Sequence, residues 1–177
     1  MKRLKIRVVI RAFRLARKLR SYGGLLSIRR NGSGVKNALI ILPEGRDNSR
    51  IARYFLKSLY QNGKVDLHFL MDRTLYHSFT GTLPSSVETY SIEDVGWFQL
   101  PKKEFVNRIL NEDYHAVIDM HPSFNLPTAY LAYLSRAPVR VGFSSLFSHY
   151  FFNVEINRKS NDFIERGYLA IQKLLDL

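Results

Sequence analysis

The chain has 177 residues, no cysteine and a formal net charge of +12. This length suits one compact domain, and the lack of cysteine excludes disulfides and thiolate metal sites and fits a reducing compartment. The charge is uneven, because residues 1–36 hold twelve Lys or Arg and no acidic residue, whereas residues 37–177 hold fifteen of each sign. The sequence therefore predicts a basic arm joined to an electrically neutral domain.

The first predicted element is a cationic amphipathic helix over residues 3–20. Basic residues recur on one face at spacings of three and four. The adjoining apolar side carries Leu4, Val8, Ala12, Leu15 and Leu19, widened by Val9, Phe13 and Ala16. Gly23 and Gly24 end the helix, so we assign residues 1–24 to it and residues 25–36 to a flexible basic linker.

A helix of this kind suits an anionic membrane surface, where each nearby cation contributes about 1 kcal/mol. The predicted membrane contacts are Arg3, Arg7, Arg11, Phe13, Arg14, Leu15 and Lys18. The charges recur too often for a membrane span, and no apolar run follows that would fit a secretory signal. Three alternatives stay open: a helix packed on its own domain or on a partner, a nucleic-acid-binding arm, and an organellar transit peptide.

The neutral part, residues 37–177, alternates short apolar runs with helical patterns. The runs predict strands at 38–42, 65–71, 87–92, 115–120, 139–143 and 151–156, and the helical patterns cover 51–59, 102–110, 128–134 and 162–175. Continuous apolar strands alternating with helices indicate parallel pairing with both faces buried. We therefore predict a single α/β domain with a Rossmann-like, doubly wound, mainly parallel sheet.

Ligands of such sheets bind beyond the carboxyl ends of the strands, which directs attention to three loops, at 43–49, 121–125 and 144–145. The candidate ligand-binding residues in them are Glu44, Arg46, Asn48, His121, Ser123, Asn125 and Ser144. His121 is as readily a structural hydrogen-bonding group, and Asp119 fits a loop organiser better than a catalyst. The five histidines lack metal-ligand spacing and there is no Asp-x-Asp pair, so we expect neither a metal nor a cofactor.

Four segments carry a resemblance to a known family: ALIILPEGRDNSRIA, DYHAVIDMHPSF, LAYLSRAPVRVGF and NDFIERGYLAIQKLLDL. In order and spacing they resemble the heptosyltransferases of lipopolysaccharide assembly, in glycosyltransferase family 9. The resemblance covers about residues 36–177 and implies the first, acceptor-binding domain of the two-domain GT-B fold. No segment of this sequence resembles the second, donor-binding domain.

The resemblance also bears on catalysis, because the family has a Gly-Asp pair in its first loop whose aspartate is the proposed base. Aligning the prolines puts Asp47 and Asn48 at this pair. An amide cannot accept the proton of an acceptor hydroxyl. Either Asp47 acts as the base instead or the base is lost, and we expect the loss.

From these features we expect a non-catalytic accessory protein that docks on a membrane-associated complex, peripheral on the cytoplasmic side of the inner membrane. Its expected partners are an anionic membrane surface and a protein or membrane complex. One alternative is an enzyme, the acceptor-binding half of a two-chain glycosyltransferase of lipopolysaccharide or cell-envelope glycan synthesis. A second is nucleic-acid binding through the arm, which we disfavour because the neutral domain offers no basic face to extend the contact.

Overall fold

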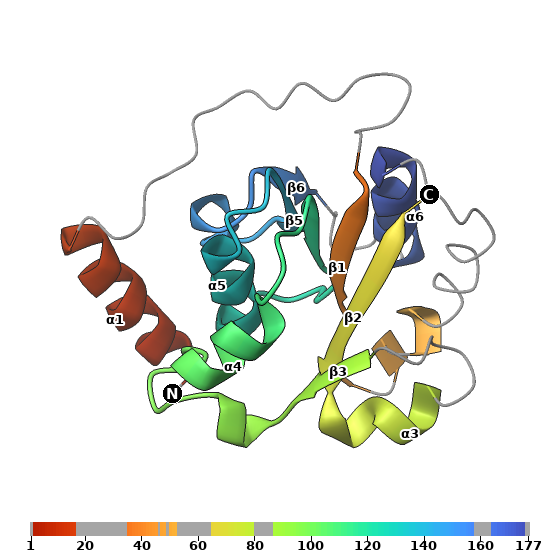
Figure 1. The fold of residues 1–177 in the computed structure, drawn as a ribbon. Helices are drawn as coiled ribbons and strands as arrows, with labels where there is room; N and C mark the ends of the chain where they lie inside the picture. Colours follow the sequence, from red (N-terminus) through yellow and green to blue (C-terminus); the bar gives the residue numbers. More distant parts are fainter. Residues whose placement is uncertain are drawn as a thin grey trace.

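A computed structural model describes residues 2–16, 35–45, 47–48, 50–52, 65–79, 87–157 and 164–175 (Figure 1). One six-stranded sheet has the order β3-β2-β1-β4-β5-β6, and every neighbouring pair is parallel. The strands are β1 (Asn37–Ile41), β2 (Asp66–Asp72), β3 (Val87–Tyr90), β4 (Ala116–Asp119), β5 (Val139–Phe143) and β6 (Val154–Ile156). The predicted doubly wound α/β fold is confirmed, and its strand order reverses between β1 and β4.

Helices cover both faces of this sheet. The helices whose bounds the structure describes are α1 (Lys2–Leu15), α3 (Tyr76–Phe79), α4 (Lys103–Ile109), α5 (Leu126–Leu134) and α6 (Ile164–Leu175). Helices α1, α4 and α5 lie on one side of β1, and α6 lies on the other (Figure 1). Successive residues of β1 serve the two sides in turn, since Leu39 packs toward α5 and Ile40 toward α6.

Most predicted elements lie where the sequence put them, with shifts that have local causes. The predicted strand 87–92 ends at Tyr90 because Ser91 begins a short 3-10 helix, Ile92–Asp94, through a capping box with Asp94. The last strand starts at Val154, since Phe151 and Phe152 turn into the core beside α5 instead. Of the predicted helix 51–59, residues 51 and 52 are helical and the remainder lies outside the described residues. The short helix α3 was not predicted.

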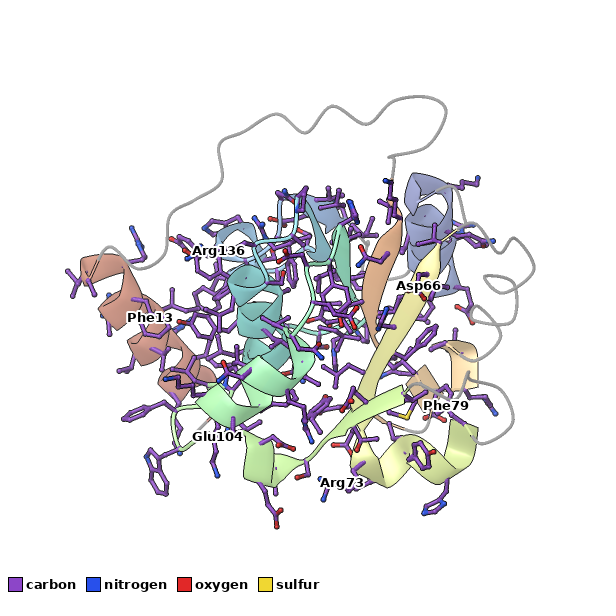
Figure 2. All side chains as sticks on the ribbon, in the orientation of Figure 1. Phe13, Asp66, Arg73, Phe79, Glu104 and Arg136 are labelled. Atoms are coloured by element: carbon purple, nitrogen blue, oxygen red, sulfur yellow. The ribbon has the colours of Figure 1, made fainter. Side chains whose placement is uncertain are left out.

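Helix α1 packs on its own domain through part of the predicted apolar side, Val9 and Phe13, together with Ile6 and Ile10. Val9 and Ile10 are only 5% and 3% exposed, and Ile6 and Phe13 pack beside them. Phe13 lies between α1 and α5, with its ring 5.3 Å from that of Tyr130 (Figure 2). The other described side chains of the predicted apolar side do not pack on the domain, because Val8 and Leu15 are 54% and 86% exposed and Ala12 is exposed as well. The side chain of Leu4 and residue Leu19 lie outside what the structure describes.

Candidate functional site

A cavity of about 450 Å³ lies where β1, β2, β3 and β4 end, at the reversal of the strand order. Its walls come from the loops that follow these strands and from one residue of α1, Ile6. The lining includes Glu44, Asn48, Asp72, Tyr90, Ser91, Ile92, Val95, Gln99 and residues 121–127. This is the edge at which a doubly wound sheet binds its ligands, as the sequence predicted.

A buried carboxylate–imidazole pair lies at the cavity, with His121 in its lining. Asp119 ends β4 and His121 follows it, and the imidazole Nδ1 lies 2.6 Å from Asp119 Oδ1. The same oxygen accepts the His121 backbone N–H at 3.0 Å, while Oδ2 accepts the hydroxyl of Thr128 at 2.7 Å. Asp119 therefore organises the loop, and it also fixes the tautomer of His121 by accepting its Nδ1–H.

The other ring nitrogen of His121 is poised for a ligand. Nε2 is buried and has no hydrogen-bond partner among the described residues. Burial alone would lower the pKa of His121, but the adjacent Asp119 carboxylate outweighs it, so the pKa is raised above its usual value. In its charged form Nε2 is a hydrogen-bond donor, and a buried donor without a partner costs free energy until a ligand or water accepts from it.

Glu44 faces the same cavity from the loop after β1. Its Oε1 accepts a hydrogen bond from the Tyr90 hydroxyl and one from the Asn125 amide, both at 3.0 Å. Burial and, after it, the Glu44 carboxylate raise the pKa of Tyr90, which keeps this phenol a donor. Gly45, which follows Glu44, has a φ of 90°, a conformation that favours glycine. The loop thus holds a carboxylate with acceptor capacity to spare beside the donor at His121.

The structure brings most of the predicted ligand-binding residues together. Glu44, Asn48, His121, Ser123 and Asn125 line the cavity. Ser144 is exposed, and it lines neither this cavity nor the two hollows along α1. Arg46 lies outside the described residues.

The candidate base Asp47 stands apart from this cluster. It is exposed and does not line the cavity, whereas its neighbour Asn48 does, with its amide donating to the Glu44 carbonyl at 3.1 Å. Asp72 and Tyr90 also line the cavity and were not predicted. Each ends a strand, which is a visible signal, but the strand order is needed to know that these strand ends meet.

The solvent side of α1 is the second candidate site. Arg7, Arg11 and Arg14 are exposed there together with Val8 and Leu15. Of the other predicted membrane contacts, Phe13 is half-buried against α5, and the side chain of Arg3 and residue Lys18 are not described. Among the described residues, no acidic group forms an ion pair with the three arginines.

Aromatic side chains meet both ends of α1. The Lys5 ammonium lies 4.3 Å from the centre of the exposed Trp97 ring, and the Arg14 guanidinium lies 5.7 Å from that of Tyr150. Such cation–π contacts hold the ends of the helix against the loops at 95–100 and 144–150. The cationic face is therefore fixed relative to the domain.

Two further types of site are absent from the part of the chain that the structure describes. There, no helix combines the length and apolar character needed to cross a bilayer. Nor do three or more His, Asp or Glu side chains of these residues gather into a group that would hold a metal ion.

The chain is similar to known proteins mainly in fold. A family model described as "Family of unknown function (DUF6913)" matches residues 22–166, and no curated protein matches the chain. A family 9 glycosyl transferase from Veillonella parvula is 15% identical, with a TM-score of 0.54 over 79% of this chain and 41% of that one. The E. coli heptosyltransferase WaaC with ADP is 17% identical, with a TM-score of 0.56 over 78% of this chain and 46% of that one.

These matches confirm the resemblance to family 9 glycosyltransferases at the level of the fold. The chain spans less than half the length of either solved structure. At such low identity the likeness carries the arrangement of strands and helices, and it carries no activity.

Proposed function

Because the chain belongs to the DUF6913 family of unknown function, its role must come from its own geometry, and we propose a non-catalytic protein of an anionic membrane surface. In this proposal the glycosyltransferase-like domain serves as an accessory subunit of a membrane-associated complex. It resides on the cytoplasmic side of the inner membrane, held there by α1. Three parts of the proposal have separate support: the membrane contact, the lack of catalysis and the protein partner.

The observation that carries the membrane contact is the composition of the exposed side of α1. Its apolar stripe is already used by the domain, yet Val8 and Leu15 remain exposed between Arg7, Arg11 and Arg14. Arginines attract anionic headgroups, and exposed aliphatic side chains between them gain from entering the interface. A helix that served only to pack on the domain would need neither feature.

The absence of catalysis is inferred from the first loop. Asp47 does not line the cavity, and the cavity-lining Asn48 has no basic group. Neither residue thus meets the requirements of a general base for an acceptor hydroxyl.

A protein partner is supported by exposed apolar side chains on a segment that contacts α1 through Trp97. Ile92, Trp97 and Phe98 are all exposed, on the segment between β3 and α4. Aromatic side chains of this kind are enriched at protein interfaces. We assign this segment to the contact with the membrane complex.

Vesicle flotation tests the membrane contact. The intact chain is mixed with vesicles of phosphatidylglycerol and phosphatidylcholine, or of phosphatidylcholine alone, and compared with the Arg7→Gln, Arg11→Gln, Arg14→Gln triple variant. Since each cation contributes about 1 kcal/mol near an anionic surface, the triple variant should bind the anionic vesicles about 100-fold more weakly at low salt. The neutral vesicles should retain little of either protein.

A matched variant removes three exposed cations elsewhere: Arg50→Gln, Arg73→Gln, Lys173→Gln. It has the same net charge as the α1 variant, and it should float nearly as well as the intact chain. Equal losses of vesicle binding by the two variants would mean that net charge alone explains the effect. Flotation of all three proteins at the same level would contradict a membrane role for α1.

A second candidate function is the acceptor-binding half of a two-chain glycosyltransferase. The observation in its favour is that a donor, His121 Nε2, and an acceptor, Glu44, face one cavity at the edge where such folds bind ligands. Purification from membranes would show whether a donor-binding chain accompanies the protein. Turnover of an ADP-sugar by that assembly, lost on Glu44→Gln, would favour the enzyme over the accessory protein.

A further inference from the structure

A groove runs along α1 on the side that faces the loop after β5. It consists of two adjoining hollows of about 540 Å³ and about 340 Å³, which share Arg7, Leu146 and Phe147. The larger hollow is lined by Arg7, Val8, Ile10, Arg11, Arg14, Leu146, Phe147, His149 and Tyr150. The smaller one continues past Ile6 to Ser123 and Phe124, at the rim of the main cavity.

The loop that forms the second wall is held by its own hydrogen bonds. The Ser145 backbone N–H donates to Ser148 Oγ at 2.8 Å, and the Ser148 hydroxyl donates to Glu155 Oε2 at 2.7 Å. Phe147 packs on Phe124, with 5.9 Å between the ring centres. Because this wall is tied to β6 and to the loop after β4, the groove is a preformed feature of the fold.

The charge of the groove comes from one wall and its apolar surface from both. Arg7, Arg11 and Arg14 follow each other at spacings of four and three, so they stand on one side of α1 over about 10 Å. No acidic residue lines either hollow among the described residues. The groove thus offers several guanidinium groups, which bind phosphate oxygens in pairs, directly above aliphatic and aromatic side chains.

We propose that this groove is a binding site for a single anionic phospholipid, with the phosphate at the arginines of α1 and an acyl chain along Ile10, Leu146 and Phe147. The proposal rests on the membrane function above and deepens it, since it adds a defined lipid site to a diffuse surface attraction. Leu146 is 67% exposed on the rim of the groove, so the apolar lining continues outward toward the bilayer that α1 contacts. An acidic peptide would match the arginines but would leave the largely apolar opposite wall without a complementary partner.

The experiment uses a lipid that needs no bilayer. Dihexanoyl-phosphatidylglycerol, below its micelle concentration, is titrated into the full chain with labelled Leu, Ile and Val methyl groups. Binding should shift the methyl signals of Val8, Ile10 and Leu146 and be about tenfold tighter than that of dihexanoyl-phosphatidylcholine. Glycerol 3-phosphate, which has the charge and no chain, should bind at least about tenfold more weakly than the phosphatidylglycerol.

Two matched variants place the site. Val8→Trp fills the groove, whereas Leu15→Trp adds the same side chain to α1 outside it; both positions are exposed, so the fold should persist. The first should weaken binding of the short lipid about tenfold, and the second should leave the affinity for the short lipid unchanged. Leu146→Ser removes apolar lining without filling the groove and should weaken binding of the short lipid as well.

Other outcomes would overturn the lipid site. These are equal binding to Val8→Trp and Leu15→Trp, methyl shifts confined to the main cavity, or equal affinity for the two headgroups. Displacement of the lipid by hexaglutamate at equal affinity would assign the groove to acidic peptides. If flotation depends on the arginines while the short lipid fails to bind, the membrane function stands and the groove proposal falls. If flotation does not depend on the arginines and the short lipid does not bind, both proposals fall.

Discussion

Helices α1 and α6 lie on opposite sides of β1, with α6 against the sheet and α1 outside α4 and α5 (Figure 1). Each buries one apolar stripe, yet their solvent-facing sides differ in charge. α1 buries Val9 and Ile10, one helical turn after Ile6 and one before Phe13. α6 buries Ile164, Tyr168 and Ile171 at the equivalent spacing. On the exposed side, α6 carries one acidic residue and cations, Glu165, Arg166 and Lys173, whereas α1 carries cations alone.

The comparison separates what the fold needs from what it does not. Packing requires only the buried stripe, because α6 packs with charges of both signs on its exposed side. Uniform positive charge even costs α1 stability, since like charges at Arg7 and Arg11, and at Arg11 and Arg14, destabilise a helix by a few tenths of a kcal/mol per pair. Its first turn also lacks the acidic residues that favour a helix N-terminus. Because the uniform positive charge of α1 lowers the stability of the helix, we attribute this charge to the binding of an anionic partner.

The largest expected effect is at the centre of α6. Tyr168 is fully buried, and its hydroxyl donates to the Met120 carbonyl at 3.0 Å. Tyr168→Ala should lower the free energy of unfolding by about 3–5 kcal/mol in urea titration, through lost packing and a carbonyl left without its partner. Leu169→Ala, on the exposed side, should stay within about 0.5 kcal/mol of the natural chain. A loss below about 1 kcal/mol for Tyr168→Ala would mean that α6 is peripheral to the core.

The matching change in α1 is Ile10→Ala. Ile10 is as well buried as the core of α6, so its truncation should cost about 2–4 kcal/mol in the same titration. Val8→Ala is the control, because Val8 is exposed and should change the value by less than about 0.5 kcal/mol. If Ile10→Ala leaves global unfolding unchanged and only makes α1 sensitive to protease, then α1 docks on a domain that is stable without it. In that case α1 would resemble α6 in its buried stripe but not in its contribution to stability.

The sequence was sufficient to predict the sheet, but it was insufficient to predict which side of α1 packs on the domain. Continuous apolar runs such as residues 38–42 predict strands buried on both faces, and the structure confirms them. α1 presents two adjacent apolar stripes, one through Val8 and Leu15 and one through Val9 and Ile10, and periodicity alone ranks them nearly equally. The choice depends on the surface that receives the helix, where Tyr130 of α5 takes up Phe13. That surface exists only in the folded domain.

The site was predictable to a similar extent. His121 and Glu44 follow predicted strands, and so the sequence placed them at the ligand-binding edge. Tyr90 and Asp72 also end strands, but their meeting with Glu44 depends on the order β3-β2-β1-β4, which no local pattern contains. The role of Asp119 as the partner of His121 likewise needs the 2.6 Å contact.

Ile6 of α1 lines the main cavity, and Tyr168 of α6 donates to the carbonyl of Met120, which precedes His121 of that cavity. The pH dependence of stability tests His121 itself. The folded protein raises the pKa of His121, mainly through Asp119, with Glu44 and Asp72 adding to it. Its contribution to stability is therefore complete below the unfolded value of about 6.5 and is lost as pH rises through the folded value, by up to about 1.4 kcal/mol per pH unit in this window. Urea titrations from pH 5.5 upward measure this slope.

The controls for this pH dependence compare slopes, because the variants also change the level of stability. Asp119→Asn removes the charge that raises the pKa and should flatten the slope above pH 6.5. His149→Gln, at an exposed histidine, should leave the slope as it is. A slope that survives Asp119→Asn would assign the titration to another group.

The smallest effect bears most directly on the difference between the two helices. Leu15 of α1 and Leu169 of α6 are both largely exposed, at 86% and 51%, so Leu15→Ser and Leu169→Ser should each change the free energy of unfolding by less than about 0.5 kcal/mol. The two variants should differ in their binding to anionic vesicles, because only the side chain of Leu15 lies among arginines that bring it to the lipid interface. There its loss should weaken binding by about 1 kcal/mol, or about fivefold, while Leu169→Ser binds as the natural chain does. Equal binding of the two variants would reduce α1 to an electrostatic contact and leave the exposed aliphatic side chains without a role at the membrane.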